Sequence, residues 1–333
     1  MSRLVVFLFA AIAFGNCLPI DDPGQPLYLT PLINSGQIHQ AKQMAMVEPL
    51  VPGVSSSSGY ITVDNTTDAN MFFWKVDTNR NGGKAPLILW LQGGPGASSM
   101  FGLFAEMGPF QVDENLKVSH RVAAWTHMYN MVFIDNPVGT GFSFVKDPSG
   151  YRTDEDGVAD HLYKFFVQFF KLYPELMSQP FYIAGESYGG KYIPSLAQKL
   201  VQMELFLKSK GMALETAKLS GVMVGNGLSD PETVSLFLFI FQFIAFVLMF
   251  LPQMFAPSGD HLYNLGLLDE TQREYFNSEV QQAIKYIQTK QFGKAFEVFD
   301  YLINADFYPY PSYFQNASGC TDYFNFLLCK VRF

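Results

Sequence analysis

One serine stands in a spacing that would make it a nucleophile. Ser187 is the centre of residues Gly185–Gly189, which read GESYG and follow the apolar run Phe181–Ala184. Gly-x-Ser-x-Gly after a buried type of strand is the nucleophile-elbow pattern. The flanking glycines permit a sharp strand-to-helix turn, because a Cβ at either place would collide with neighbouring backbone. Such a turn lifts the hydroxyl above the sheet, where a base could take its proton and backbone N–H groups could hold an oxyanion.

A serine placed in this way needs a sheet of buried strands beneath it. Four runs of apolar residues show no alternation with polar ones, and glycines follow their carboxyl ends: Pro86–Leu91, Met131–Asp135, Phe181–Ala184 and Leu219–Val224. Continuous apolarity predicts strands buried on both faces. Two further segments, Gly59–Val63 and Asn70–Val76, are also strand-like.

Helix-length segments separate these runs. Residues Thr153–Tyr173 begin with three acids, carry apolar side chains at helical spacing and end at Pro174. Strands that alternate with helices predict an α/β fold with a mostly parallel sheet, whose ligand site lies at the carboxyl ends of the strands. We therefore expect the glycine-rich ends at Gly93, Gly139 and Gly185 to meet there.

Composition narrows the classes of function. The 333 residues are 49% hydrophobic, which is enough for a sizeable core. The net charge is −8 and no cluster of Lys and Arg is present, which argues against a nucleic-acid partner. We expect no metal and no cofactor.

The N-terminus has the pattern of a signal peptide. Arg3 precedes the apolar stretch Leu4–Gly15, whose 12 residues are too few to span a bilayer, and small residues around Cys17 offer cleavage points. Residues 1–17 are therefore predicted to direct the protein into the secretory pathway. An N-terminal helix buried in the core is the alternative.

Two other features agree with this route. Asn65 and Asn316 each begin an Asn-x-Ser/Thr triplet, so both are candidate glycosylation sites. The chain has three cysteines, and Cys17 would leave with the signal peptide. Cys320 and Cys329 then remain as a candidate disulfide pair, which spacing alone cannot establish.

Four motifs together carry a family resemblance. They are Trp90–Ser99 (WLQGGPGASS), Asp135–Ser143 (DNPVGTGFS), Gly185–Pro194 (GESYGGKYIP) and Gly225–Gly227 (GNG). In this order they resemble the serine carboxypeptidases, an α/β-hydrolase family, and fit the vitellogenic-like carboxypeptidase branch well. The resemblance runs from about Gln25 to Lys330, apart from one insert.

The resemblance implies a role for each matching residue. Ser187 would attack the last peptide bond of a peptide or protein with a free C-terminus. The backbone N–H groups of Gly94 and Tyr188 would form the oxyanion hole. The substrate carboxylate would be held by Gln92, Gly93, Glu106 and Glu186.

A carboxylate beside two glutamates is repelled unless a proton is shared, and close pairing raises the pKa of such acids. We therefore expect acidic conditions, as in a lysosome or an acidic extracellular lumen. A solvated helix acid is the alternative interpretation of Glu106. Two positions depart from the family: many relatives have Asn where Gln92 stands, and a disulfide cysteine where Ala97 stands.

The base of the reaction has no counterpart here. The family supplies an Asp and then a His well after the nucleophile. His261 is the one histidine after Ser187, and it is interpreted as a surface residue of the cap region. The resemblance therefore predicts that residues 1–333 are inactive or nearly so.

An apolar insert interrupts the matching region. Residues 234–253 separate Asp230–Thr233 from the family-like segment Leu262–Glu270, and deleting these 20 residues restores the family spacing. Val-Ser can be encoded by the splice-donor sequence GTAAGT and a terminal Gln by the acceptor CAG, so we hypothesise a retained intron. Residues 331–333 would be read-through into the next one. A membrane span at Leu236–Leu251 is the alternative, although 16 residues fall below the usual ~17–25.

The predicted organisation is a signal peptide at 1–17, an extended N-terminal arm at 18–58, a core at 59–229 and a cap region at 230–330. The final strands of the sheet would be missing, which would leave an apolar edge unpaired. A non-catalytic secreted binding protein and a serine esterase or acyltransferase of the same fold stay open. The side-chain preference at the cleaved bond and the oligomeric state are not predicted.

Overall fold

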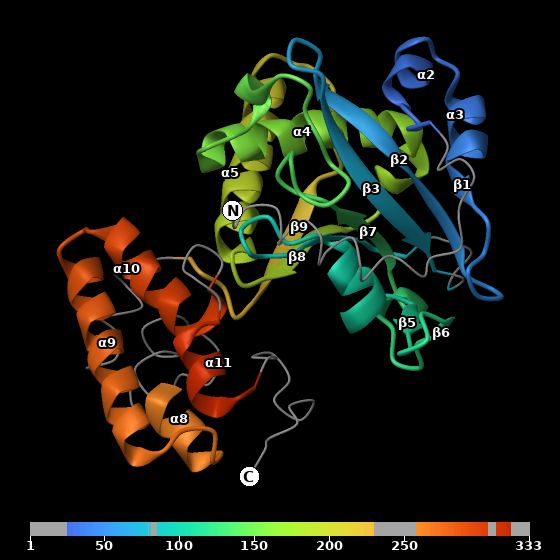
Figure 1. Cartoon of the computed structure of the whole chain (residues 1–333). Coiled ribbons are helices and arrows are strands. Elements are labelled where there is room, and N and C mark those ends of the chain that lie inside the picture. Colours follow the sequence, from blue (N-terminus) through green and yellow to red (C-terminus); the bar gives the residue numbers. More distant parts are fainter. Residues whose placement is uncertain (1–24, 79, 81–84, 230–257, 306–310, 321–333) are drawn as a thin grey trace.

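A computed structural model describes residues 25–78, 80, 85–229, 258–305 and 311–320 (Figure 1). The predicted signal peptide, the insert at 234–253, residues 331–333 and Cys329 lie outside this part. Within the described residues, no helix combines the length and the apolarity that crossing a bilayer requires.

A sheet of seven strands forms the centre of the molecule, in the order β1-β2-β3-β7-β4-β8-β9. The strands are β1 Met46–Val47, β2 Ser55–Asp64, β3 Ala69–Asp77, β4 Leu87–Leu91, β7 Asn130–Ile134, β8 Phe181–Glu186 and β9 Leu219–Gly225. The pairs from β1 to β7 are antiparallel, and β7, β4, β8 and β9 run parallel to one another. Strands β5 (Phe110–Val112) and β6 (Val118–His120) form a separate hairpin.

The parallel strands confirm the predicted fold class. All residues of β4 and β7 are buried, as their continuous apolarity required. Their bounds fall within one residue of the predicted ones. Strand β2 is longer than predicted because its serines Ser55–Ser58 pair with the end of β3, from Asp77 to Trp74.

Two long helices pack together beside the sheet (Figure 1). Helix α4 spans Glu155–Leu172, close to the predicted range, and the Asp154 side chain caps it by accepting a hydrogen bond from the Gly157 N–H. Its Phe166 and Phe170 rings contact Phe181 of β8 at centroid distances of 5.0 and 5.6 Å. Helix α5, Gly189–Ser209, begins immediately after the elbow.

The N-terminal arm is not extended as predicted. Residues Thr30–Asn34 form α2 and Ile38–Ala45 form α3. Burial of small side chains such as Ala41 and Ala45 stabilises these helices, and Lys42 pairs with Glu175 at 2.8 Å. The many Pro, Gly and Ser residues of the arm indicated an extended segment, because composition carries no information about these contacts.

The later described segments are helical and share a hydrophobic cluster of their own. They are α8 Ser258–Asn264, α9 Glu270–Gln288, α10 Phe292–Phe299, η7 Asp300–Asn304 and α11 Tyr313–Ser318. Phe276 and Phe314 are fully buried in this cluster. Figure 1 shows these helices side by side.

Strand β9 is the last strand of the sheet that the structure describes, and it pairs with β8 alone. Val222, Met223 and Val224 are 47%, 37% and 41% exposed, which is unusual for a parallel strand. The described sheet therefore has an apolar edge at β9.

Candidate active site

Ser187 lies at the turn between β8 and α5, above the carboxyl end of the parallel sheet. Its φ is +54°, in the left-handed region that a side chain rarely adopts. Three backbone hydrogen bonds hold the turn: the Ser187 N–H donates to the Gly225 carbonyl at 3.0 Å, and the Ser187 carbonyl accepts from Leu228 at 2.8 Å and from Gly190 at 3.0 Å. Ser187 itself is exposed. The residues thus form a nucleophile elbow, with local strain held by the surrounding backbone.

Glycines around the turn are required by close backbone contacts. A Cβ on Gly185 would lie 2.2 Å from the Leu91 carbonyl oxygen, and one on Gly190 would lie 2.6 Å from the Leu228 nitrogen. At Gly189 the nearest atom would be 3.1 Å away. Of the two positions that flank the serine in the motif, Gly185 is therefore the stricter, and Gly190 carries the tight contact on the helix side.

The loop after β4 packs against the elbow. A Cβ on Gly93 would lie 2.6 Å from both the Ser187 Cβ and the Tyr188 nitrogen, so the two segments are in direct contact. No described residue accepts a backbone hydrogen bond from the N–H of Gly94 or of Tyr188. Both of these predicted oxyanion-hole residues thus offer a free donor next to Ser187.

A hydrogen-bonded chain joins β4 to the residue that precedes the serine. The Trp90 indole N–H donates to Gln92 Oε1 at 2.8 Å, and Gln92 Nε2 donates to Glu186 Oε1 at 2.7 Å. The Gln92 N–H also donates to Ser99 Oγ at 3.1 Å. Gln92 is 6% exposed, so its amide is held in one orientation.

Glu106 completes an acidic pair with Glu186. It ends the π-helix η2, Gly102–Glu106, and one of its carboxyl oxygens is buried with no partner among the described residues. Burial raises the pKa of Glu106 to about 7, and the hydrogen bond and charge of Glu186 add to the rise, while Gln92 opposes it. The raised pKa means that Glu106 is protonated at acidic pH, and the solvated-acid interpretation of Glu106 does not fit this environment.

Sequence reasoning missed three residues that shape this region. Trp90 orients Gln92 as described above. Asp135 follows β7, is fully buried, and accepts hydrogen bonds from Ser98 Oγ at 2.6 Å and the Ser99 N–H at 3.0 Å, which ties the loop after β4 to β7. An acid at the end of an apolar run was the available signal for Asp135.

The third missed residue, Glu155, lies in the first turn of α4. Burial raises the pKa of its carboxyl, and it interacts with the Tyr188 phenol. Nothing in the spacing of Glu155 and Tyr188 indicated this contact, because it depends on how α4 packs beside the elbow.

No described residue forms a hydrogen bond with the Ser187 hydroxyl, and the described histidines have other surroundings. His161 is buried in α4, where Arg152 Nε donates to its Nε2 at 2.8 Å; burial, with the nearby Arg152 charge, lowers its pKa to about 4. His120 and His127 stack on each other. His261 lies in α8 and is exposed, as expected of a surface residue.

The predicted modification sites lie apart from the elbow. Asn65, in the turn between β2 and β3, and Asn316, in α11, are exposed. Cys320 is fully buried and disulfide-bonded. The pairing with Cys329 stays a prediction.

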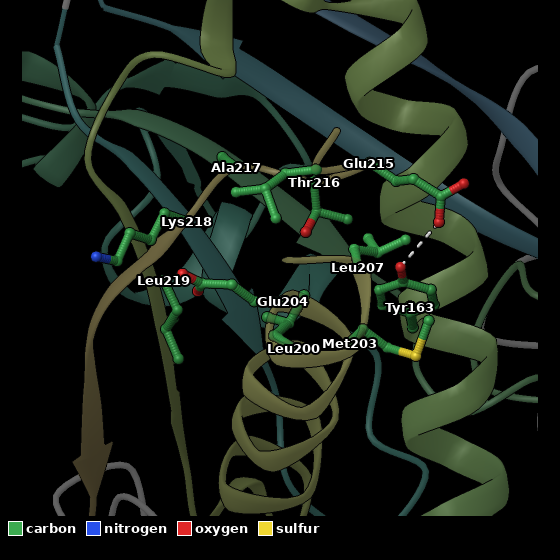
Figure 2. A pocket seen from close by; sticks show the side chains of 11 residues that line it. Tyr163, Leu200, Met203, Glu204, Leu207, Glu215, Thr216, Ala217, Lys218 and Leu219 are labelled. Carbon is green, nitrogen blue, oxygen red and sulfur yellow. Dashed lines mark hydrogen bonds between the residues drawn. The ribbon is translucent and has the colours of Figure 1, made fainter. Parts of the chain in front are cut away.

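A small hollow of about 10 Å³ lies between α4, α5 and the start of β9, away from the elbow (Figure 2). Figure 2 shows the Tyr163 hydroxyl donating to the Glu215 carboxylate, at 3.0 Å. None of the predicted site residues lines this hollow. Within the described part of the chain, no three His, Cys, Asp or Glu side chains are placed to hold a metal ion.

A serine elbow above the carboxyl ends of a mostly parallel sheet defines the α/β-hydrolase class. A model of the serine carboxypeptidase family matches residues 47–327, and the chain belongs to this family.

Individual relatives support the same family assignment. The chain is 44% identical over 308 residues to a probable serine carboxypeptidase CPVL of Rattus norvegicus, with 92% of this chain and 59% of the relative covered. It is 40% identical to the venom serine carboxypeptidase of Apis mellifera, with 98% and 66% covered. For the vitellogenic carboxypeptidase of Aedes aegypti the identity is 38%, with 92% and 59% covered.

A solved structure supports the fold. The prohormone-processing carboxypeptidase Kex1(delta)p of Saccharomyces cerevisiae superposes with a TM-score of 0.61 at 26% identity, covering 78% of this chain and 56% of that one. The chain spans about 60% of the length of the first curated relatives that it matches.

Proposed function

We propose that Ser187 is the nucleophile of a serine carboxypeptidase that removes the last residue of peptides or proteins at acidic pH. The acidic pair beside the elbow carries this proposal. Glu186 directly precedes Ser187, and its carboxylate accepts from Gln92 at 2.7 Å, next to a Glu106 whose pKa burial raises to about 7. A protonated Glu106 and the Gln92 amide would supply hydrogen-bond donors for the C-terminal carboxylate of a substrate. Hydrolysis of a simple ester requires no such carboxylate site.

The remaining roles follow from the geometry. The N–H groups of Gly94 and Tyr188 would stabilise the oxyanion, because they are free and fixed before charge develops. Gly93, packed against the serine, would lie beside the substrate carboxylate. An acidic compartment of the secretory pathway, lysosomal or extracellular, is the proposed location, since Glu106 keeps its proton there. Glycans at Asn65 and Asn316 and a Cys320–Cys329 disulfide belong to the same proposal.

The domain organisation is proposed as predicted, with a signal peptide at 1–17, a core at 59–229 and a cap region at 230–330. The described parts of 230–330 are helical, which suits a cap. A retained intron at 234–253 stays the hypothesis for the insert. The sequence of the dominant transcript across codons 233 to 254 tests it: if that transcript carries these codons, the hypothesis is wrong.

The test of substrate class is a comparison of matched ligands. Two ligands are each titrated against the Ser187→Ala variant at about pH 5, where Glu106 is protonated. They are an N-blocked dipeptide with a free C-terminus and the same dipeptide as its C-terminal amide. The free acid is expected to bind at least tenfold more tightly. Equal affinity for acid and amide would contradict a carboxypeptidase site and favour an esterase or acyltransferase.

A second candidate function is carboxylate-peptide binding without catalysis. It is favoured by the Ser187 hydroxyl, which has no base among the described residues. We propose that residues 1–333, assayed alone, bind such peptides and cleave them slowly, with only the ~10³–10⁴-fold advantage over water that survives loss of the base. Rapid turnover of the dipeptide by this polypeptide would refute the point.

A further inference from the structure

A second hollow, of about 160 Å³, lies on the antiparallel side of the molecule and uses none of the predicted active-site residues. The loop before β2, the end of β3, strand β6 and the 3-10 helix η3 (Trp125–His127) surround it. Its lining combines charged and polar side chains with apolar ones. The residues are Gly53, Val54, Val76, Asp77, Arg80, Pro109, His120, Thr126 and His127.

Two imidazoles stack at this hollow. The rings of His120 and His127 have centroids 5.6 Å apart and planes inclined by 27°. His120 Nδ1 lies 3.2 Å from the Arg121 carbonyl oxygen, so that nitrogen is the donor in this contact. Both side chains are exposed and open to solvent protons.

The surrounding charges are mostly positive. Arg80 lines the hollow, and its guanidinium contacts the Met128 sulfur. Asp77 is the one acid in the lining, and the buried Lys75 pairs with it. Arg121, next to His120, donates to the Phe104 and Phe110 carbonyl oxygens at 3.0 and 3.1 Å.

Acidic pH is therefore expected to make the charge of this hollow more positive. Arg80 brings a guanidinium group to the lining, Asp77 is paired with Lys75, and the loop before β2 contributes no titratable group to the lining. An ordinary imidazole becomes charged between about pH 7 and pH 5. Two stacked imidazolium ions repel each other, and an anion between them and Arg80 would remove that repulsion.

The geometry favours an anion over a metal ion. Among the described residues, no third ligand forms a metal-binding group with the two histidines. The volume of the hollow admits a small tetrahedral ion.

We propose that His120, His127 and Arg80 form an acid-activated site for a tetrahedral oxyanion, either a free sulfate or phosphate or the head of a sulfate or phosphate monoester. Thr126, which is 5% exposed, also lines the hollow. The site does not depend on Ser187 or on the acidic pair, so its failure would leave the carboxypeptidase proposal untouched.

Sulfate is the probe, because its charge is constant between about pH 5 and pH 7.5 while that of the histidines changes. Isothermal titration calorimetry on the full chain at fixed ionic strength is expected to show saturable binding at pH 5. The affinity should fall at least tenfold at pH 7.5, on the order of two exposed charge pairs. Proton uptake on binding, measured near pH 6.5 in two buffers of different ionisation enthalpy, should be positive.

Variants separate the site from general charge attraction. The His120→Gln and His127→Gln double variant should lose the pH dependence, and Arg80→Gln should weaken binding at both pH values. His39→Gln, which changes an exposed histidine of α3, is the matched control and should bind as the wild type does. Near-identical circular dichroism spectra would establish that each variant is folded.

Sources of the anion are compared by titrating sulfate against a sugar monosulfate. Tighter binding of the monosulfate identifies an ester head group as the preferred ligand, and equal binding identifies the free ion. No saturable binding at pH 5, equal affinity at both pH values, or full affinity in the double histidine variant would each overturn the proposal.

Discussion

Replacement of Glu106 by Gln should free carboxylate binding from its dependence on pH. Burial and the neighbouring Glu186 raise the pKa of Glu106 to about 7, so below pH 6 it is a neutral donor and above pH 8 it is an anion that repels the substrate carboxylate. Binding that requires this one proton loses about tenfold per pH unit above the pKa, or about 1.4 kcal/mol. Between pH 5 and pH 8.5 the wild-type site should therefore weaken roughly 30-fold.

The Glu106→Gln variant keeps a neutral donor at every pH. Its affinity for a free-acid dipeptide should change less than about threefold over the same range, in a Ser187→Ala background that prevents turnover. Tryptophan fluorescence can report the binding, because the Trp90 indole N–H donates to Gln92 at 2.8 Å within the same network. Glu114→Gln, at an exposed position in the β5–β6 turn, is the control and should keep the wild-type pH profile.

The same substitution should alter stability with a defined sign. A folded-state pKa raised from 4.5 to about 7 contributes stability that is fully present below pH 4.5 and is lost as the pH rises through 7. Because Glu106 is only half buried, solvent screening reduces this cost to about 1 kcal/mol. Urea unfolding should thus show Glu106→Gln more stable than the wild type at pH 8 and equal to it at pH 4. Parallel pH profiles of the two proteins, in binding and in unfolding, would refute the shared-proton argument.

Three other substitutions test the packing that holds the site. Gly93→Ala places a Cβ 2.6 Å from the Ser187 Cβ, and the strain should lower the free energy of unfolding in urea by about 1–3 kcal/mol; an unchanged free energy of unfolding would show that the loop shifts freely. Trp90→Phe leaves the buried Gln92 carbonyl oxygen without its donor, so it should cost about 1–3 kcal/mol in unfolding and weaken the binding of the free-acid dipeptide but not that of its amide. Phe166→Ala, at a fully buried position, should cost about 3–5 kcal/mol without altering the ratio of acid to amide affinity, and a changed ratio would contradict its purely structural role.

The sheet could be predicted from the sequence because its signal is local. Strands β4 and β7 are buried on both faces, and all their residues except Asn130 are apolar. The elbow was equally readable, since Gly185 and Ser187 stand at a fixed spacing that the backbone contacts impose. In contrast, α2 and α3 depend on side chains far along the chain, such as the Lys42–Glu175 pair, and propensity alone missed them.

The network around the acidic pair could be predicted only in part. The family resemblance pointed to Gln92 and Glu186, but their contact joins residues 94 positions apart in the sequence. The Trp90 donor and the buried Asp135 acceptor became visible only with the strand order, which sets the ends of β4, β7 and β8 side by side. Polar side chains at the strand ends indicated where the site lies, but their hydrogen-bond partners could be identified only from the fold.

Under the proposed function, the position of Glu186 next to Ser187 would explain the removal of one residue at a time. Consecutive Cα atoms lie about 3.8 Å apart, and the carbonyl carbons of consecutive substrate residues are separated by a similar distance. A substrate carboxylate held at Glu186 and Gln92 would therefore bring the carbonyl carbon one residue earlier towards the serine hydroxyl. Longer C-terminal extensions would leave the carboxylate site empty or displace the scissile carbonyl. Glu186 would thus fix the distance to the scissile bond because it directly precedes the strained turn, and the buried Glu106 beside it would make the binding depend on a proton.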